Sequence, residues 1–262
     1  MVRCMGKKTY RYIYGPVPSW RLGSSLGIDP ISRGEKVCTF DCTYCQIGKT
    51  ICLTDERKIF VPSKGIIEEL NSLPPLNIDY ITFSGTGEPT LAENLGEMIK
   101  AVKQIRLEKV AVLTNSSLVH REDVMKDLFL ADFVVCKLDA SSQDVFERIN
   151  RPIRNIKIGI VIRAIKDFKK YYKGKMALQI MFMEENKIYA KEIARIAKEI
   201  NPDEVQLNTP LRPCGIKPLT KGEMAEIEEY FCSLNTVSVY RAEKKRVKPI
   251  SSEDTLKRRG KI

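Results

Sequence analysis

Short apolar segments rich in β-branched residues recur along this chain and alternate with stretches of helical periodicity. Such segments are typical of strands buried on both faces of a parallel sheet. Each helical stretch would return the chain to the same end of the sheet, as parallel pairing requires. The sequence therefore predicts an α/β fold of six strand and helix units. The six predicted strands are Leu26–Ile31, Ile78–Phe83, Lys109–Leu113, Phe133–Leu138, Ala177–Met183 and Glu204–Leu207.

The stretches between these strands carry apolar residues three and four positions apart, which is the spacing of an amphipathic helix. Ser63 is a candidate N-cap for the first helix, and Arg151-Pro152 divides residues 143–172 into two shorter helices. Periodicity alone fits either an open doubly wound sheet or a partial barrel. The other predicted helices are Ser63–Leu73, Glu93–Ile105, Glu122–Leu130 and Lys187–Ile200.

The composition is that of an ordinary globular protein. Of the 262 residues, 43% are hydrophobic and 29% are charged, which argues against a disordered or fibrous chain. No run approaches the roughly 18–20 apolar residues of a membrane helix, so we expect a cytoplasmic protein without a membrane segment. The eight cysteines are too few and too clustered for a disulfide scaffold, which makes metal binding the first function to consider.

Positive charge exceeds negative charge by 11, and much of the excess lies in residues 241–262, with nine Lys or Arg against three Asp or Glu. This balance favours an anionic partner such as a nucleic acid or an acidic protein. Within the tail, the segment SSEDTLKRR predicts a short helix capped by Ser251 or Ser252, with cations at its end. We expect an N-terminal extension over residues 1–24, a core over 25–235 and a basic C-terminal extension over 236–262.

The most specific motif is VCTFDCTYCQIG, in which Cys38, Cys42 and Cys45 have C-x3-C-x2-C spacing in a loop after the first predicted strand. Three thiolates so close in sequence can occupy three corners of one iron-sulfur cubane. The fourth iron then lacks a protein ligand and is open to a small molecule. The alternatives are a structural zinc site or a closed cluster with Cys52 as the fourth ligand.

At these cysteines the sequence resembles the radical S-adenosylmethionine (SAM) superfamily, whose signature also has an aromatic residue before the last cysteine, here Tyr44. The resemblance extends from about Tyr14 to Leu207. It implies a partial (β/α)6 barrel of the TIM type with parallel strands and a 4Fe-4S cluster held by the three cysteines. It also implies SAM bound at the open iron and cleaved after one-electron reduction to methionine and a 5′-deoxyadenosyl radical, which abstracts hydrogen from a substrate.

Residues after the predicted strands fit this resemblance, because parallel α/β folds build their sites at the carboxyl ends of strands. After the second strand comes SGTGEPT, with Gly85, Gly87 and Glu88. The superfamily's Gly-Gly-Glu-Pro motif, which contacts the SAM amino group, is similar to Thr86-Gly87-Glu88-Pro89, with Thr86 in place of the first glycine. Taken alone, this segment also suits a simple turn between strand and helix.

Three later positions are further candidates, each with a structural alternative. Asn115, after the third strand, could bind a ribose or a carboxylate, or belong to a polar turn. Asp139, after the fourth strand, could bind ribose hydroxyls or substrate, or be a solvated strand end. Cys214, in the loop after the last strand, could supply a hydrogen atom or contact substrate, or be an inert thiol.

The N-terminal segment GPVPSWRLGSSLGID resembles an extension in a poorly characterised radical SAM group classed beside the wyosine tRNA base synthases. Arg21 there could bind an anion, and Trp20 could cover the cluster or stack on a base. The structural alternative is a Pro-rich loop that caps the bottom of the barrel. The additional N-terminal cysteine group of the wyosine synthases is absent from the sequence, which argues against the same reaction.

These observations lead to three hypotheses. The first is a radical SAM enzyme that acts on RNA, with a tRNA base as its substrate. The second is a radical SAM enzyme for a peptide or small molecule, whose basic surface docks an acidic flavodoxin or ferredoxin as the electron donor. The third is a non-catalytic iron-sulfur electron carrier or a zinc-stabilised binding module.

Overall fold

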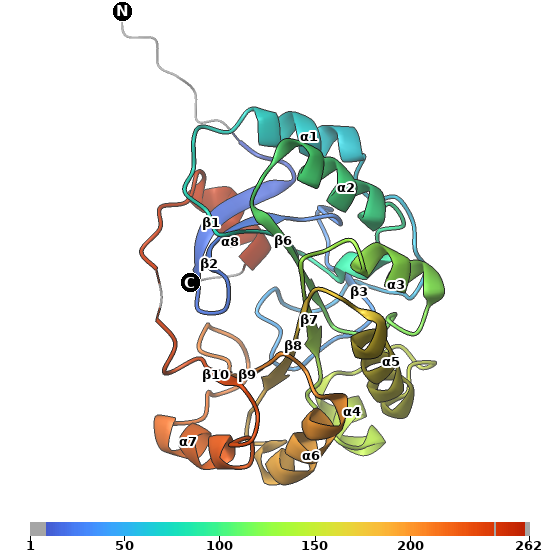
Figure 1. Ribbon diagram of the computed structural model, residues 1–262, viewed down its shortest axis with the longest axis vertical. Coiled ribbons are helices and arrows are strands. Elements are labelled where there is room, and N and C mark those ends of the chain that lie inside the picture. The colour runs from blue at the N-terminus through green and yellow to red at the C-terminus, as the bar shows by residue number, and fades with distance from the viewer. Residues whose placement is uncertain (1–8, 244, 260–262) are drawn as a thin grey trace, which may run out of the picture.

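An eight-stranded sheet, curled into an open barrel, organises the computed structural model, which describes residues 9–243 and 245–259 (Figure 1). Its strands, in spatial order, are β1 (Ile13–Ser19), β2 (Gly23–Ile28), β5 (Tyr80–Phe83), β6 (Lys109–Thr114), β7 (Phe133–Lys137), β8 (Lys175–Met181), β9 (Glu204–Asn208) and β10 (Thr236–Ser238). All neighbours pair in parallel except β1 with β2. The edge strands β1 and β10 do not pair, so the barrel is partial, as predicted.

Helices cover the outer face of this sheet (Figure 1). The predicted break between residues 143 and 172 is confirmed, because two helices occupy this segment. No helix within the described ranges is long and apolar enough to cross a bilayer. The helices are α1 (Ser63–Asn71), α2 (Leu95–Ile105), α3 (Glu122–Leu128), α4 (Gln143–Ile149), α5 (Ile158–Tyr171), α6 (Ala190–Ile200), α7 (Lys221–Glu229) and α8 (Ser252–Arg259), with 3₁₀ turns η1 (Pro89–Leu91) and η2 (Lys187–Tyr189).

Strand register sorts the buried side chains into two groups, because successive residues of a strand point to opposite faces. Phe83, Val112 and Val134 are aligned across β5, β6 and β7 and belong to the main core under the helices. The alternate residues Ala111 and Phe133 are also paired, and they pack in a smaller cluster with Leu22 from the turn between β1 and β2. The β1-β2 hairpin therefore closes the amino end of the barrel.

Two details differ from the sequence-based expectations. Residues Ile13–Ser19 form a strand of the sheet and not the expected loop, although the segment does close the barrel bottom through the turn that follows it. Pro16 and Pro18 are tolerated there because an edge strand does not need every N–H for pairing. Ser63 is the first residue of α1 and makes no capping hydrogen bond, so its prediction as the N-cap is also wrong. Its hydroxyl instead accepts a hydrogen bond from Asn94 Nδ2 at 3.2 Å.

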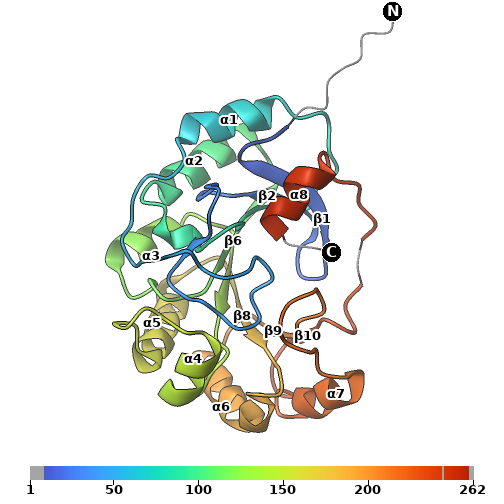
Figure 2. The same ribbon diagram turned by 180° about the vertical axis from the view of Figure 1, so that it is seen from behind.

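The C-terminal helix α8 packs against β1, which places the two ends of the described chain side by side (Figure 2). The Ile250 amide donates to the Gly15 carbonyl at 2.6 Å, and the Gly15 amide donates to Thr255 Oγ1 at 3.0 Å. Ser251 caps the helix as predicted, since its hydroxyl accepts from the Asp254 amide at 3.2 Å. The tail thereby covers hydrogen-bonding groups that an edge strand would otherwise expose.

Arg258 connects α8 to the end of β2. Its guanidinium donates to Ser32 Oγ at 3.0 Å and to the Arg11 carbonyl, and its Nε lies 3.6 Å from Asp29 Oδ2. Both side chains are buried. Burial raises the pKa of Asp29, and hydrogen bonds from Ser32 and Thr86 together with the charge of Arg258 act in the opposite direction. The ion pair therefore offsets part of the cost of burying this carboxylate.

We predict that Arg258→Gln lowers the free energy of unfolding by about 3 kcal/mol, because it leaves the Asp29 carboxylate buried without its counter-charge. Urea denaturation followed by circular dichroism measures the change. Lys257→Gln is the matched control: the Lys257 side chain is exposed and its one ion pair with a described residue is to exposed Glu253, so its removal should leave the midpoint unchanged. Equal midpoints for both variants would contradict the assigned role of Arg258.

Candidate functional site

The three cysteines lie on one loop that crosses the carboxyl end of the barrel. Cys38 ends the short strand β3 (Val37–Cys38), which pairs with β4 (Cys52–Leu53). The Cys45 amide donates to the Cys42 carbonyl at 3.1 Å, which forms a tight turn between these two residues. The loop is attached to the end of α4, where the Thr43 amide donates to the Ile149 carbonyl at 2.9 Å. The predicted cysteine loop is therefore an ordered part of the fold.

Two asparagine side chains approach the thiols. Asn115 Nδ2 lies 3.5 Å from Cys38 Sγ, and Asn150 Nδ2 lies 3.5 Å from Cys42 Sγ. Asn115 was predicted as a site residue, but Asn150 was not. Its only sequence signal is its place just before Arg151-Pro152, where α4 ends.

Burial dominates the electrostatics of the thiols. It raises the pKa of Cys38 to about 12 and that of Cys42 to about 11, with further increases from the charges of Glu88 and Asp139 respectively. Burial alone would lower the pKa of Lys36, but the nearby thiols of Cys45 and Cys38 raise it. A bound metal replaces the thiol protons, because thiolate is the ligand form.

The donor set fits an iron-sulfur cluster. Among the residues that the structure describes, no three Cys, His, Asp or Glu side chains converge closely enough to hold a single metal ion. Cysteines that hold a cubane bind separate irons and need not meet at one point. Amide donors near cysteine sulfurs are also a usual means of tuning such clusters.

The segment after β5 packs directly beneath the cysteine loop. A Cβ atom on Gly87 would lie 1.9 Å from the Val37 carbonyl oxygen, so only glycine permits this approach. The Thr86 amide and hydroxyl both donate to Asp29 Oδ2, at 3.2 and 2.7 Å. Gly85 has a φ of +128° and lines the barrel cavity. The glycines thus bring this segment into contact with β3.

Glu88 is buried and links the ends of β5 and β6. Its Oε1 accepts from the Thr90 amide at 3.1 Å, from Thr90 Oγ1 at 2.6 Å and from Thr114 Oγ1 at 2.7 Å. Its Oε2 accepts from the Asn115 amide at 2.7 Å. Burial raises the pKa of Glu88, and these hydrogen bonds oppose the change.

Asp139 follows β7 and is fully enclosed. Its carboxylate accepts from the Tyr44 hydroxyl, from Asn150 Nδ2 at 2.8 Å and from the Met181 amide at 2.8 Å. Lys137 Nζ lies 3.5 Å from the same carboxylate and 4.9 Å from the centre of the Tyr44 ring. The structure therefore brings together Tyr44, Asp139 and the unpredicted Asn150.

Cys214 is placed apart from this group. Its thiol lies 3.5 Å from the Ile216 carbonyl, in the half-buried loop after β9. The thiol packs against the main core, and Cys214 is not among the residues that line the barrel cavity.

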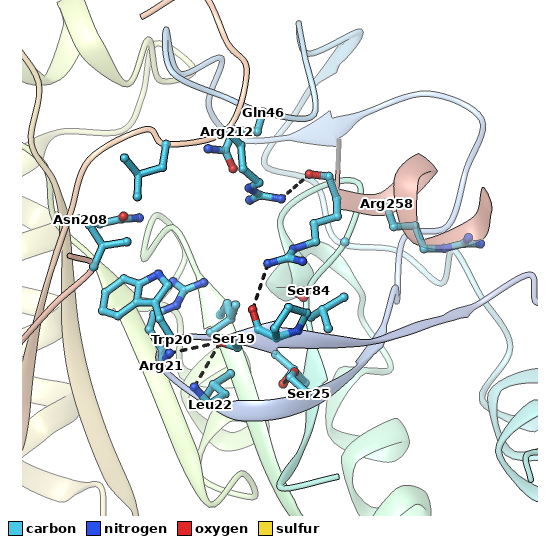
Figure 3. Close-up of a pocket in the computed structure, with 18 of the residues that line it drawn as sticks. Ser19, Trp20, Arg21, Leu22, Ser25, Gln46, Ser84, Asn208, Arg212 and Arg258 are labelled. Atoms are coloured by element: carbon cyan, nitrogen blue, oxygen red, sulfur yellow. Dashed lines mark hydrogen bonds between the residues drawn. The ribbon is translucent and has the colours of Figure 1, made fainter. Parts of the chain in front are cut away.

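A cavity of about 390 Å³ occupies the barrel beside the cysteine loop (Figure 3). Gln46 and Ile47, directly after Cys45, form part of its wall. Other parts come from the β1-β2 hairpin, from Asn208 at the end of β9 and from α8. The volume is within the range of pockets that bind small molecules and cofactors.

Comparison with known proteins places this site in a family. The model of the Radical SAM superfamily matches residues 36–200, which is more than half of the chain. The UPF0026 protein of Synechocystis sp. is 41% identical over 214 residues, which cover 81% of this chain and 79% of that protein. The UPF0026 protein of Methanocaldococcus jannaschii is 36% identical over 231 residues, with coverage of 86% and 71%.

Among solved structures, Streptococcus suis SuiB bound to S-adenosylmethionine is similar with a TM-score of 0.63 and 16% identity. The similarity covers 83% of this chain and 50% of SuiB, so this chain spans about half of that protein. At this identity the likeness concerns the fold, and the partial barrel predicted from the sequence is confirmed. The chain therefore belongs to the radical SAM superfamily and to its UPF0026 proteins, as an enzyme that uses a 4Fe-4S cluster and S-adenosylmethionine.

Proposed function

We propose that Cys38, Cys42 and Cys45 hold the 4Fe-4S cluster and that SAM binds between the cluster and the barrel cavity. When bound there, the two cofactors would supply the one-electron reductive cleavage of the C5′–S bond of SAM to methionine and a 5′-deoxyadenosyl radical, with a reductant as the electron source. A substrate in the cavity then gives a hydrogen atom to the radical. The observation that carries the proposal is the position of the cysteine loop directly beside a cavity of about 390 Å³.

Glu88 and the Gly85–Gly87 segment are the proposed contacts for the SAM amino group. Glu88 Oε1 already accepts three hydrogen bonds, whereas Oε2 accepts one, from Asn115. With one donor on Oε2, this oxygen has a lone pair available for an ammonium donor. The three donors on Oε1 keep the carboxylate in place, so that it need not reorganise when the ammonium arrives.

We assign Asp139 a positioning role in place of the ribose contact expected from the sequence. Its oxygens are taken up by Tyr44, Asn150 and the Met181 amide, within a buried group. Asp139 thus fixes Asn150, which approaches Cys42, and Tyr44, which precedes Cys45. Asn115 approaches Cys38 in the same way and is proposed as a further contact for the cluster or for SAM.

The proposed electron donor is an acidic low-potential protein such as flavodoxin or ferredoxin, and the proposed compartment is the cytoplasm. The net positive charge of the chain suits an acidic partner. A reducing compartment keeps the cysteines as thiols for cluster assembly.

We predict that Cys38→Ala, Cys42→Ala and Cys45→Ala each abolish 5′-deoxyadenosine formation by the anaerobically reconstituted, dithionite-reduced protein with SAM. Each variant removes one of three ligands, so its iron content should fall as well. Cys52→Ala is the control, because Cys52 lies on β4 and is not required by a three-ligand site. Loss of product in Cys52→Ala would favour a closed four-ligand cluster, and one zinc with no iron would favour a binding module.

We predict that Asn150→Ala retains the iron of the wild type but makes the reduction potential of the cluster more negative. The variant removes an amide donor from Cys42, and such donors stabilise the more negatively charged reduced state. A redox titration followed by electron paramagnetic resonance measures the potential. Asn155→Ala, in an exposed loop five residues later, is the control. An unchanged potential in Asn150→Ala would refute the proposed contact.

An RNA substrate, specifically a tRNA base, is the second candidate, and the net charge of +11 favours it. Part of the basic tail is engaged within the protein: Lys245 pairs with Asp79, and Arg258 pairs with Asp29. Arg246 and Lys248 are exposed, and neither forms an ion pair with the residues that the structure describes. These two side chains are therefore the proposed phosphate contacts of the tail.

For this candidate we predict that tRNA binding, measured by fluorescence anisotropy, weakens steeply as salt rises. The variant Arg246→Gln/Lys248→Gln should reduce the slope of log K against log salt by about one for each contact removed. Lys191→Gln/Lys198→Gln on α6 removes the same charge elsewhere and should leave the slope near that of the wild type. Absence of tRNA binding at low salt would exclude RNA and leave the radical chemistry in place.

A further inference from the structure

Four arginines line one cavity, and three of them, from distant parts of the chain, lack the acidic partner that Arg258 has in Asp29. Arg21 lies in the turn between β1 and β2, Arg212 in the loop after β9, and Arg259 at the end of α8. In Figure 3, Arg212 enters the hollow from one side and Trp20 and Arg21 from the other, whereas Arg258 on α8 is directed away from them. The convergence of three permanent cations in one hollow is costly unless an anion balances them.

Within residues 9–243 and 245–259, no acidic side chain supplies that anion. No Asp or Glu among the described residues lies within ion-pairing distance of Arg21, Arg212 or Arg259. Arg212 donates to the Arg259 carbonyl, and Arg259 donates to the Pro18 carbonyl at 3.4 Å, so both are held in place by neutral groups. The Nε of Arg21 is buried and has no hydrogen-bond partner within the described part of the chain.

The environment of the three side chains disfavours their charge. Burial, followed by the charges of Arg212 and Arg259, lowers the pKa of Arg21 to about 10. Burial and the charge of Arg259 lower the pKa of Arg212 to about 10 as well. Both remain cationic at neutral pH, so the unpaired positive charge is retained.

SAM is a poor candidate for the missing anion. It carries an ammonium, a sulfonium and one carboxylate, and its net charge is therefore positive. Three guanidiniums would repel the sulfonium more than one carboxylate could offset. The three arginines also lie outside residues 36–200, the part of the chain that matches the superfamily model.

We infer that Arg21, Arg212 and Arg259 form a binding site for a phosphate group of the substrate. A phosphate monoester carries about two negative charges and a backbone phosphodiester carries one, and both present acceptor oxygens that match planar guanidinium donors. The inference adds a substrate class to the proposed function. It rests on the proposed function only where it takes the phosphate-bearing molecule to be the substrate that donates a hydrogen atom. The phosphate can come from a small phosphate ester or from a polynucleotide backbone.

The test is isothermal titration of inorganic phosphate into the anaerobically reconstituted protein with saturating SAM and without reductant, at constant ionic strength. We expect saturable binding that Arg21→Gln and Arg212→Gln each weaken by about tenfold or more, because each removes a charge-assisted hydrogen bond. Arg163→Gln removes an exposed arginine of α5, away from the cavity, and should leave the affinity within about twofold. Equal affinities in all four proteins would overturn the inference.

Thermal unfolding separates a binding role from a structural one. Without phosphate, Arg21→Gln should unfold at the same temperature as the wild type or higher, because it removes a buried cation that its neighbours repel. With phosphate, only the wild type and Arg163→Gln should gain stability. A lowered unfolding temperature of Arg21→Gln together with unchanged phosphate affinity would assign Arg21 a structural role and overturn the inference.

Two further arms identify the source of the phosphate and test SAM directly. If adenosine 5′-monophosphate binds and Arg21→Gln weakens its binding, the source is a small phosphate ester. If a 12-nucleotide RNA binds in an Arg21-dependent manner and adenosine 5′-monophosphate does not, the source is a polynucleotide. Competition between phosphate and SAM, with weaker SAM binding in Arg21→Gln, would assign the arginines to the SAM carboxylate and overturn the inference. Because no reductant is present, these outcomes are independent of 5′-deoxyadenosine formation, which is assayed separately.

Discussion

Three buried carboxylates at the carboxyl ends of the strands hold the rim of this barrel together. Asp29, after β2, accepts from Thr86, after β5. Glu88, after β5, accepts from Thr114 at the end of β6 and from the Asn115 amide. Asp139, after β7, accepts from the Met181 amide at the end of β8. Each carboxylate thus connects one strand end to the next, and the connections fix the loops that carry the cysteines and their neighbours.

Burial of these carboxylates costs free energy of folding, and their hydrogen bonds fix the positions of the loops. A buried carboxylate loses hydration, which raises the pKa of Asp29 and Glu88, and the loss is offset only when donors surround the oxygens. Here the donors are backbone amides and hydroxyls of adjacent loops, so the same bonds that satisfy the charge also position those loops. Asp139 extends the principle to the cysteine loop, because it accepts from Tyr44 and from Asn150. A group that reacts through a radical needs such rigid placement.

The extent to which the sequence predicts this structure depends on how local each interaction is. The parallel strands were identifiable because their apolar, β-branched runs reflect burial on both faces, and the cysteine spacing identified the loop that the barrel presents at its rim. Strand β1 was missed, since Pro16 and Pro18 oppose strand formation except at an edge. Asn150 was missed because its approach to Cys42 depends on the packing of α4 against a loop more than 100 residues earlier. The convergence of Arg21 with Arg259 likewise requires the tail to fold back onto β1.

The two parts of the chain contribute different groups to the barrel. Residues 36–200 match the superfamily model and contain the three cysteines, Glu88, Asn115 and Asp139, so the common radical chemistry belongs to this part. The flanking segments add the β1-β2 hairpin, the loop after β9 and α8, and all four arginines of the cavity wall come from these segments. Arg258 couples α8 to the rim through Asp29, whereas Arg21, Arg212 and Arg259 form no ion pair with the rim carboxylates in the described part of the chain. Recognition by these three arginines can therefore change without altering the rim. Such a division allows one reactive centre to serve different substrates, with selectivity set by the charge that the two ends of the chain bring to the open side of the barrel.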